Sequence, residues 1–376
     1  MVYLDYAANA PVDKKVLDIF YDTNIRFYAN PNATHKLGQE AKKIIDESTE
    51  HIAKMLKILP EEIIYTSGAS ESNNLAIKGI CERYKSKGKH IITTPLEHNS
   101  ITAPLSVMQA NGFEVDVVPV TKEGLVNIEE LKNMIREDTI LVSVIAVDSE
   151  IGLKQPVEEI GEILKDYPNT FFHIDASQAI GKVDIDLTNI DLMTIAPHKF
   201  YGINGFGALI KKKNVSLVPI INGGKSTTVY RSGTPVTAMV VALDKALEIA
   251  YSKMKERYEY IKRLNERVKK ELSKYKDVHI ISTENSVPHT LNIAIDNIKS
   301  LDFAKKLEDY DVYISTKTSC CPSETPSKLV YALTNNKNLA LSSLRISFSH
   351  LTTNEEIDIF LDAFDKVLKE MTNGEV

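Results

Sequence analysis

The feature that most constrains the fold of this chain is a regular alternation of helical segments with short apolar runs. Strands that alternate with helices pair in parallel through right-handed crossovers, and strands that are apolar throughout are buried on both faces. The sequence therefore predicts an α/β fold in which a mainly parallel seven-stranded sheet is flanked by helices. The expected strands are 63–66, 90–94, 113–118, 139–147, 170–174, 192–195 and 206–210.

This alternation stops near residue 250. A long helix with one possible break is expected from 236 to 275, because the chain has no Gly or Pro there after Pro235. Beyond it, strands, helices and a polar loop follow in mixed order. We therefore predict a large domain over 15–250 and a smaller α+β domain formed by 1–14 and 251–376.

Composition narrows the class of protein. The chain has 376 residues, enough to bury a sizeable core, and only three cysteines, which argues against a secreted disulfide scaffold. Its 45 basic and 51 acidic residues give a net charge of −6, which weighs against a dedicated nucleic-acid binder. No apolar run reaches the roughly 18 residues of a membrane span, and the N-terminus lacks a signal-peptide pattern. We therefore expect a cytoplasmic protein with no membrane or direct nucleic-acid partner.

The first polar segment with chemical potential follows the strand at 63–66. The turn Ser67-Gly68-Ala69-Ser70 opens a helix, where free backbone N–H groups and small hydroxyls bind anions well. An ordinary helix N-cap followed by Glu71 has the same residue types. The turn alone therefore leaves both interpretations open.

Two further segments follow predicted strands. Asp175 ends the strand at 170–174, and a carboxylate buried there is costly unless a cation pairs with it. Lys199 follows the strand at 192–195, and a lysine partly withdrawn from water loses its proton more readily and becomes nucleophilic. Taken singly, a structural ion pair and a surface lysine explain these two residues equally simply.

The three cysteines divide into two kinds. Cys81 follows an apolar helical face, so we expect it to pack in the core. Cys320 and Cys321 are neighbours in a polar loop, where a thiol is accessible. A zinc site is not expected, because the chain has no CxxC pair.

The order of these segments is more informative than any one of them. A phosphate-type turn, the aromatic His98, a strand-end carboxylate at Asp175 and a lysine 24 residues later are what pyridoxal phosphate needs. The carboxylate keeps the pyridine nitrogen protonated, so that the ring acts as an electron sink, and the lysine holds the cofactor as a Schiff base.

Matching motifs run almost from end to end of the chain. On these motifs the chain resembles the cysteine desulfurases of the NifS/IscS type, in the class V aminotransferase superfamily of fold type I, whose large domain binds pyridoxal 5'-phosphate. The motifs are 3–8, 30–31 with His35, 66–79, 97–98, 150–152 with 155–156, 173–182, 198–207, 231–234 and 344–347.

The resemblance implies how the cofactor is held. Lys199 would carry it covalently and shuttle protons, His98 would stack on the ring, and Asp175 would pair with the pyridine nitrogen. Gln178 would hydrogen-bond the phenolic oxygen of the ring. The phosphate would be bound by four residues, Gly68, Ala69, Ser70 and His198, and by Thr234 of the other subunit in a homodimer.

The resemblance also implies the substrate and the nucleophile. Arg345 would clamp the carboxylate of L-cysteine, with Asn30 and Ser149 nearby. Cys320 would attack the substrate sulfur, release L-alanine and pass a persulfide to a sulfur-acceptor protein for tRNA thiolation, iron–sulfur cluster or other cofactor biosynthesis. Counting the loop from Pro326 places Ser319 at this position instead, and Cys320 is preferred because only a thiol carries a persulfide.

Several positions depart from the family pattern. Asp148-Ser149 replaces the usual Asn pair, Ala196 replaces a phosphate-binding serine, and the segments 202–205 and 223–229 differ. The departures predict a specialised or weakened branch. Two alternatives therefore stand beside the desulfurase: another class V lyase or aminotransferase, and a degenerate, non-enzymatic partner protein.

Overall fold

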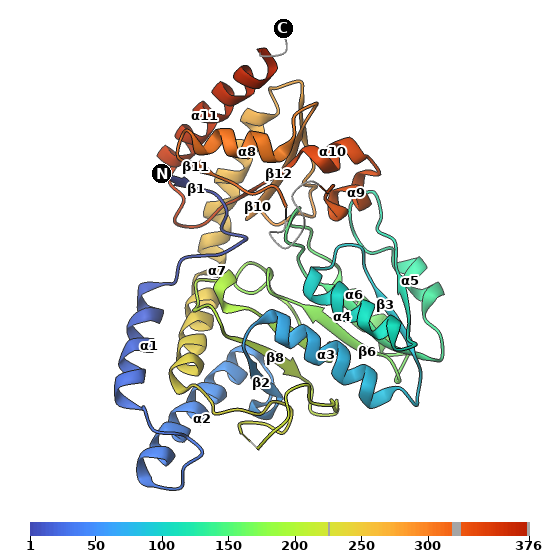
Figure 1. Cartoon of the computed structure of the whole chain (residues 1–376), viewed down its shortest axis with the longest axis vertical. Coiled ribbons are helices and arrows are strands. Elements are labelled where there is room, and N and C mark those ends of the chain that lie inside the picture. The colour runs from blue at the N-terminus through green and yellow to red at the C-terminus, as the bar shows by residue number, and fades with distance from the viewer. Residues whose placement is uncertain (225, 318–324, 374–376) are drawn as a thin grey trace.

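The computed structural model describes residues 1–224, 226–317 and 325–373, so Cys320 and Cys321 lie outside the described residues. A lower body is built on the large sheet, and an upper body carries both ends of the chain (Figure 1). The long helix α7 (Thr237–Leu272) runs from one body into the other. It is continuous over 36 residues, without the possible break.

The large sheet has seven strands in the order β2-β8-β7-β6-β5-β3-β4, which confirms the predicted sheet. Only β8 is antiparallel to its neighbours, so the other six strands end at the same edge. The strands are β2 (Ile63–Thr66), β3 (His90–Thr93), β4 (Glu114–Val117), β5 (Thr139–Ile145), β6 (Phe171–Asp175), β7 (Leu192–Ile195) and β8 (Gly207–Lys211).

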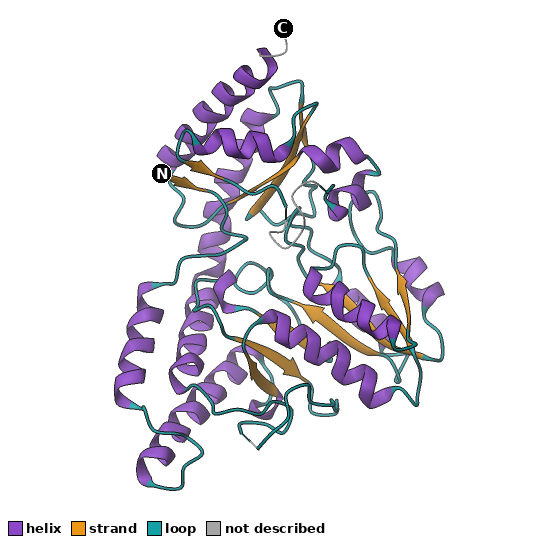
Figure 2. Cartoon of the chain, in the orientation of Figure 1, coloured by secondary structure: helices purple, strands orange, loops and turns teal. Residues whose placement is uncertain are grey.

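Burial on both faces explains why this sheet is covered by helices on both sides (Figure 2). Along β5, Leu141 packs into the core on one face and Val142 into the core on the other. Ile64 and Ile63 of β2 likewise pack into the cores on opposite faces of the sheet. The helices of this body are α1 (Lys14–Arg26), α2 (Lys36–Leu56), α3 (Ala69–Tyr84), α4 (Asn99–Ala110), α5 (Ile128–Met134) and α6 (Val157–Leu164).

The upper body has its own apolar core, which includes Leu4, Leu291, Phe303 and Phe364. Its strands are β9 (Val278–Ile280), β10 (Thr290–Ile295) and β12 (Ser343–Ser347), all antiparallel, and the parallel pair β1 (Val2–Tyr3) and β11 (Val312–Tyr313). Its helices are α8 (Ser300–Glu308), α9 (Lys328–Thr334), α10 (Lys337–Ser342) and α11 (Asn354–Asn373). The division of the chain at residue 250 stays a prediction.

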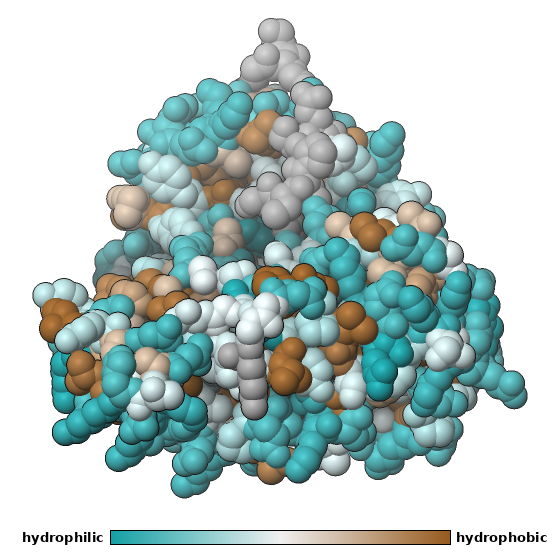
Figure 3. Space-filling model, turned by 60° about the horizontal axis from the view of Figure 1, so that its bottom comes forward, coloured by the Kyte–Doolittle hydropathy of each residue, from teal (hydrophilic) through white to brown (hydrophobic). Residues whose placement is uncertain are grey.

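The surface in Figure 3 is mostly hydrophilic, with hydrophobic residues in several small groups. Among the helices of the described residues, none is both long and apolar enough to cross a membrane. Cys81 lies fully buried in the core between α3 and the sheet, as expected of a packing residue, and burial raises the pKa of its thiol to about 12.

Gly181 offers a test of how α7 packs on the lower body. Its φ is +73°, and a Cβ atom there would lie 2.9 Å from the Cβ of Ala250 on α7. We expect Gly181→Ala to lower the free energy of unfolding by about 2–3 kcal/mol, from backbone strain plus overpacking. Gly205→Ala is the control, because Gly205 has a φ of +77° but nothing within 4 Å of the added Cβ.

The control variant isolates the backbone strain of an alanine at positive φ, which costs about 1 kcal/mol. Urea unfolding of both variants measures the difference. Equal losses of stability in the two variants would contradict the close approach of α7 at Gly181.

Candidate active site

Five loops leave the shared edge of the large sheet and line one cavity with a volume of about 370 Å³. They follow β2, β3, β5, β6 and β7, and the upper body adds one arginine from β12. Since parallel strands place their carboxyl ends together, residues distant in sequence meet here. Ten of the predicted site residues line this cavity: Gly68, Ala69, Ser70, His98, Ser149, Asp175, Gln178, His198, Lys199 and Arg345.

Two predicted site residues, Asn30 and Thr234, do not line this cavity. Asn30 is exposed between α1 and α2, and its Oδ1 accepts a hydrogen bond from the Asn32 N–H at 2.9 Å. Thr234 is exposed and lines a separate pocket, which shares Ser67 with the main cavity. Cys320 lies outside the described residues.

Lys199 projects from the short 3₁₀ helix η2 (Pro197–Lys199) that follows β7. Its Nζ donates hydrogen bonds to the carbonyls of Ala7 at 2.9 Å and Ala8 at 2.6 Å. Gln178 Nε2 donates to the same Ala7 carbonyl at 2.8 Å. The N-terminal segment therefore forms one wall of the site and holds the lysine amine.

A hydrogen-bonded network joins Asp175 to His98. Asp175 accepts from the Ser177 N–H at 2.9 Å and from Asn73 Nδ2 at 2.8 Å. Asn73 Nδ2 also donates to Ser100 Oγ at 2.8 Å, which in turn lies 2.8 Å from His98 Nδ1. The network fixes the carboxylate and the imidazole relative to each other.

Sequence analysis missed Asn73 and Ser100 as site residues. Asn73 is fully buried on α3, among the apolar residues that pack on the sheet. A polar side chain on a buried helix face needs a polar partner, and this is the signal that could have found it.

Burial sets the protonation of the histidines that line the site. Burial lowers the pKa of His98, against the opposing effect of Asp175, so its imidazole is neutral. The backbone N–H of Ser100 donates to His98 Nδ1 at 3.1 Å, which places the ring proton on Nε2. Burial, followed by the charge of Lys199, also lowers the pKa of His198 to about 4.

Glu97 supports the loop that carries His98. Its carboxyl group accepts hydrogen bonds from the backbone N–H of Ile145 at 2.7 Å and from Thr94 Oγ1 at 2.9 Å. Burial raises the pKa of Glu97 to about 8, so the side chain is mainly a neutral acid near pH 7. A neutral acid adds no second negative charge beside Asp175.

The turn after β2 has the geometry of an anion site. Gly68 is the N-cap residue of the 16-residue helix α3, so it has no side chain to compete for the first-turn N–H groups. Gly207 of β8 lies so close that a Cβ there would be 2.7 Å from the Gly68 Cα. This close packing holds the turn against the end of the sheet.

Arg345 reaches the cavity from β12 and is only 2% exposed. Its Nη2 donates to Asp5 Oδ1 at 2.7 Å, and its Nη1 donates to the Ser149 carbonyl at 2.9 Å. Its buried Nε has no hydrogen-bond partner among the described residues. The guanidinium is thus fixed between the two bodies with donor capacity left.

These groups fit pyridoxal phosphate. The helix N-terminus suits the phosphate, Asp175 suits a protonated ring nitrogen, and the amine of Lys199 suits the aldehyde. Ser177 Oγ lines the same cavity, is buried, and has no partner among the described residues. An orphaned hydroxyl in a polar cavity indicates a missing ligand.

Asp148, one of the departures from the family pattern, stabilises its own loop. Its carboxylate accepts backbone N–H bonds from Glu150 at 2.8 Å, Ile151 at 2.7 Å and Leu153 at 2.6 Å. It is only 1% exposed and does not line the cavity. Burial outweighs these three bonds and raises the pKa of Asp148 to about 6.

The chain was compared with known proteins. The model of a family described as aminotransferase class-V matches residues 2–360. A cysteine desulfurase IscS of Neisseria meningitidis serogroup C is 38% identical over 365 residues, which cover 95% of this chain and 89% of that protein. A NifS/IcsS protein homolog of Lactobacillus delbrueckii subsp. bulgaricus is 36% identical over 378 residues, which cover 99% of this chain and 98% of that protein. A solved NifS-like protein has a TM-score of 0.93 at 34% identity, covering 98% of this chain and 99% of that one.

The role of Asp148 can be tested by two substitutions. Asp148→Ala leaves three buried N–H groups without their acceptor, so we expect a loss of about 2–4 kcal/mol in the free energy of unfolding. Asp148→Asn keeps one oxygen for Glu150 and Ile151, and we expect it to stay within about 1 kcal/mol of the parent. Thermal and urea unfolding measure both, and equal losses would contradict this role.

Proposed function

The chain belongs to the aminotransferase class-V family and is a pyridoxal-phosphate-dependent cysteine desulfurase of the NifS/IscS type, and we propose that it transfers the sulfur of L-cysteine to Cys320. The observation that supports the proposed site best is the single cavity at the sheet edge. It holds an amine, a buried carboxylate, a neutral imidazole, a helix N-terminus and a buried guanidinium from five segments of the chain.

Each group of the cofactor has a matching part of this cavity. In our proposal Asp175 would pair with the ring nitrogen, Gln178 would donate to the phenolic oxygen, and Lys199 would hold the aldehyde end of the cofactor. Gly68, Ala69, Ser70 and His198 would bind the phosphate. When bound, pyridoxal phosphate withdraws electrons from the α-carbon of an amino acid, which makes the Cα–H bond acidic.

Arg345 binds the carboxylate of L-cysteine in this proposal. A guanidinium presents several donors in a rigid fork that matches a carboxylate. The bonds to Asp5 and to the Ser149 carbonyl hold that fork in place before substrate arrives. Part of the entropic cost of fixing the Arg345 side chain is therefore met during folding rather than when the substrate binds.

Lys199 and His98 move the protons. An amine can accept the Cα proton only when it is itself unprotonated, and Lys199 lies at the cavity wall within reach of bound substrate. His98 is neutral with its proton on Nε2, so that this atom is a hydrogen-bond donor and general acid toward the cavity.

Cys320 then accepts the sulfur. Its thiolate attacks the sulfur of L-cysteine, so that a new S–S bond forms while the Cβ–S bond of the substrate breaks. The electron pair of that bond and a proton go to the carbon, which leaves L-alanine and a persulfide on Cys320. A sulfur-acceptor protein receives the persulfide sulfur, in tRNA thiolation, iron–sulfur cluster assembly or other cofactor biosynthesis.

The nucleophile is tested by exchanging each loop cysteine in turn. We expect Cys320→Ser to lower alanine formation from L-cysteine at least about 100-fold, because a hydroxyl cannot carry a persulfide. Cys321→Ser is the matched control and should keep most of the activity. Mass spectrometry after incubation with L-cysteine should find an added sulfur atom of about 32 Da on Cys320.

Each other outcome has a definite meaning. A persulfide on Cys321 alone would assign the nucleophile to that residue. Full alanine production by Cys320→Ser would indicate another class V lyase with incidental loop thiols. A purified protein that binds no pyridoxal phosphate would indicate a degenerate partner protein.

We also propose that the enzyme is a cytoplasmic homodimer. Helix α1 exposes Leu17, Tyr21 and Ile25 at four-residue spacing, so that they form one apolar stripe. Thr234 is exposed beside Ser67, at the phosphate end of the main cavity. Both features are consistent with a second copy that packs on this chain and completes the phosphate site.

Light scattering tests the dimer. We expect the purified protein to have about twice the 42.0 kDa mass of one chain. Thr234→Ala should stay dimeric but release pyridoxal phosphate more readily, because it loses only a hydroxyl contact across the interface. A monomer that holds the cofactor as tightly as the parent would refute the shared site.

A further inference from the structure

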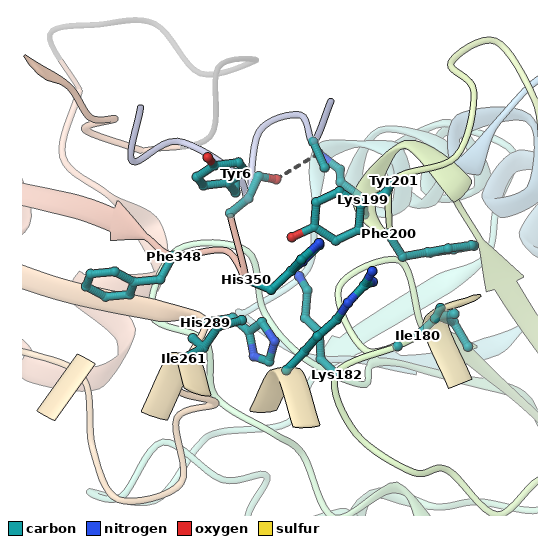
Figure 4. Close-up of a pocket in the computed structure, with 15 residues that line it drawn as sticks. Tyr6, Ile180, Lys182, Lys199, Phe200, Tyr201, Ile261, His289, Phe348 and His350 are labelled. Carbon is teal, nitrogen blue, oxygen red and sulfur yellow. Dashed lines mark hydrogen bonds between the residues drawn. The ribbon is translucent and has the colours of Figure 1, made fainter. Parts of the chain in front are cut away.

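A second cavity lies next to the active site and shares Ala7 and Lys199 with it. It is small, about 20 Å³ in volume, and extends from Lys199 toward α7, where Arg257 and Ile261 line it. Neither the cofactor nor the substrate of the proposed function uses this space. Its lining residues show what it can bind (Figure 4).

The lining of this second cavity is basic. Lys182, His289 and His350 come from three separate loops, and their side chains gather at its centre (Figure 4). Arg257 and Lys199 add two more nitrogen-bearing side chains, whereas none of the lining residues is Asp or Glu. The cavity thus combines three formal cations and two imidazoles.

Arg257 and Lys182 have no carboxylate partner among the described residues. Arg257 is partly buried, and no described carboxylate lies within 4.0 Å of its guanidinium, which instead stacks 5.1 Å above the ring of Tyr201. The only hydrogen-bond acceptor of Lys182 Nζ in the described chain is Gln178 Oε1, at 2.5 Å. Most of their N–H groups therefore have no protein acceptor.

The imidazole of His289 also has a buried polar atom without a partner in the described part of the chain. It is only 7% exposed, and its Nδ1 has no hydrogen-bond partner within the described part of the chain. His350 Nδ1 is also buried without a partner there. Unpartnered buried polar atoms are rare in proteins, and a cavity lined by two of them is a place for a ligand.

The nearest carboxylates are engaged elsewhere. Asp13 and Glu256 act on Arg257 and His350 only from beyond ion-pair distance. Asp13 Oδ1 accepts from the Lys15 N–H at 2.8 Å, and Glu256 pairs with Lys253 at 3.0 Å. Neither residue lines the second cavity.

The uncompensated charge affects the titration of the groups around it. Burial, followed by the charges of Lys199 and Arg345, lowers the pKa of Lys182 to about 7. Burial and the neighbouring Lys182 hold the pKa of His289 well below its usual range. Removing cations from water without a counter-ion is costly, and native proteins compensate for it.

An ion can reach the cavity from solvent. A surface pocket lined by Lys253, Glu256, Tyr260 and Arg263 shares Arg257 and His350 with the second cavity. These two residues therefore lie between the surface and the interior. An anion is drawn toward such a basic entrance by its charge.

We propose that the second cavity binds one small inorganic anion, held by Arg257, Lys182 and the imidazoles of His289 and His350. The anion neutralises the charge that these side chains place behind Lys199. It acts on the active site through Lys182, whose ammonium fixes the orientation of the Gln178 amide by binding its oxygen. This last consequence rests on the proposed function, whereas the anion site does not.

Bromide is the probe for the test, because it is small and visible by anomalous scattering. Crystals of the pyridoxal-phosphate-loaded enzyme soaked in bromide should show an anomalous peak among Arg257, Lys182 and His289. The melting temperature in bromide should exceed that in gluconate of equal ionic strength. We expect a saturable rise of about 3 °C at roughly one hundred times the dissociation constant.

Variants separate this site from general salt effects. Arg257→Gln should abolish both the bromide-dependent rise and the anomalous peak, while Arg257→Lys should keep part of each. Lys255→Gln is the matched control, since it removes one exposed charge from the same helix outside the cavity.

Three results would overturn the anion site. The first is a bromide-soaked crystal without the anomalous peak. The second is a bromide-dependent rise in melting temperature that is equally large in Arg257→Gln. The third is a carboxylate of a second copy bonded to Arg257. Loss of desulfurase activity alone leaves these readouts unchanged, so failure of the proposed function can be told apart from failure of the anion site.

Discussion

Burial of the large sheet on both faces is the constraint on which the rest of this structure depends. Because neighbouring residues such as Leu141 and Val142 enter opposite cores, the sheet needs helices on both sides. Crossover helices keep successive strands parallel, so the carboxyl ends of six strands share one edge. The active-site cavity lies at this edge, where the loops that follow the strands bring polar side chains together.

The site is completed by contacts between the two bodies. Arg345 of the upper body bonds to Asp5 and to the Ser149 carbonyl. Glu150 accepts from Ser327 Oγ at 2.5 Å, and its carbonyl accepts from Asn292 Nδ2 at 3.1 Å. Several of these groups are buried, so a shift of one body against the other would leave them unsatisfied. The position of Arg345 is therefore tied to the packing of the whole molecule.

Much of the fold could be predicted because its signals are local. The runs at 63–66 and 192–195 are mainly apolar and correspond to β2 and β7 residue for residue. Helix α1 was not among the expected elements, although Leu17, Tyr21 and Ile25 recur in it at the four-residue spacing of a helix. The pairing of β1 with β11 joins residues about 310 positions apart, and no local pattern contains that information.

The sequence by itself determined the class of fold, the family and the residues that match its motifs, because apolar periodicity and motif order are properties of the linear chain. Only the tertiary structure decided which groups meet. It linked Asn73 to Asp175, turned Asp148 toward the amides of its own loop, and brought Lys182 and Arg257 to one cavity without a carboxylate. Hydrogen bonds and charges act over a few ångströms in space, and that distance is set by packing rather than by separation along the chain.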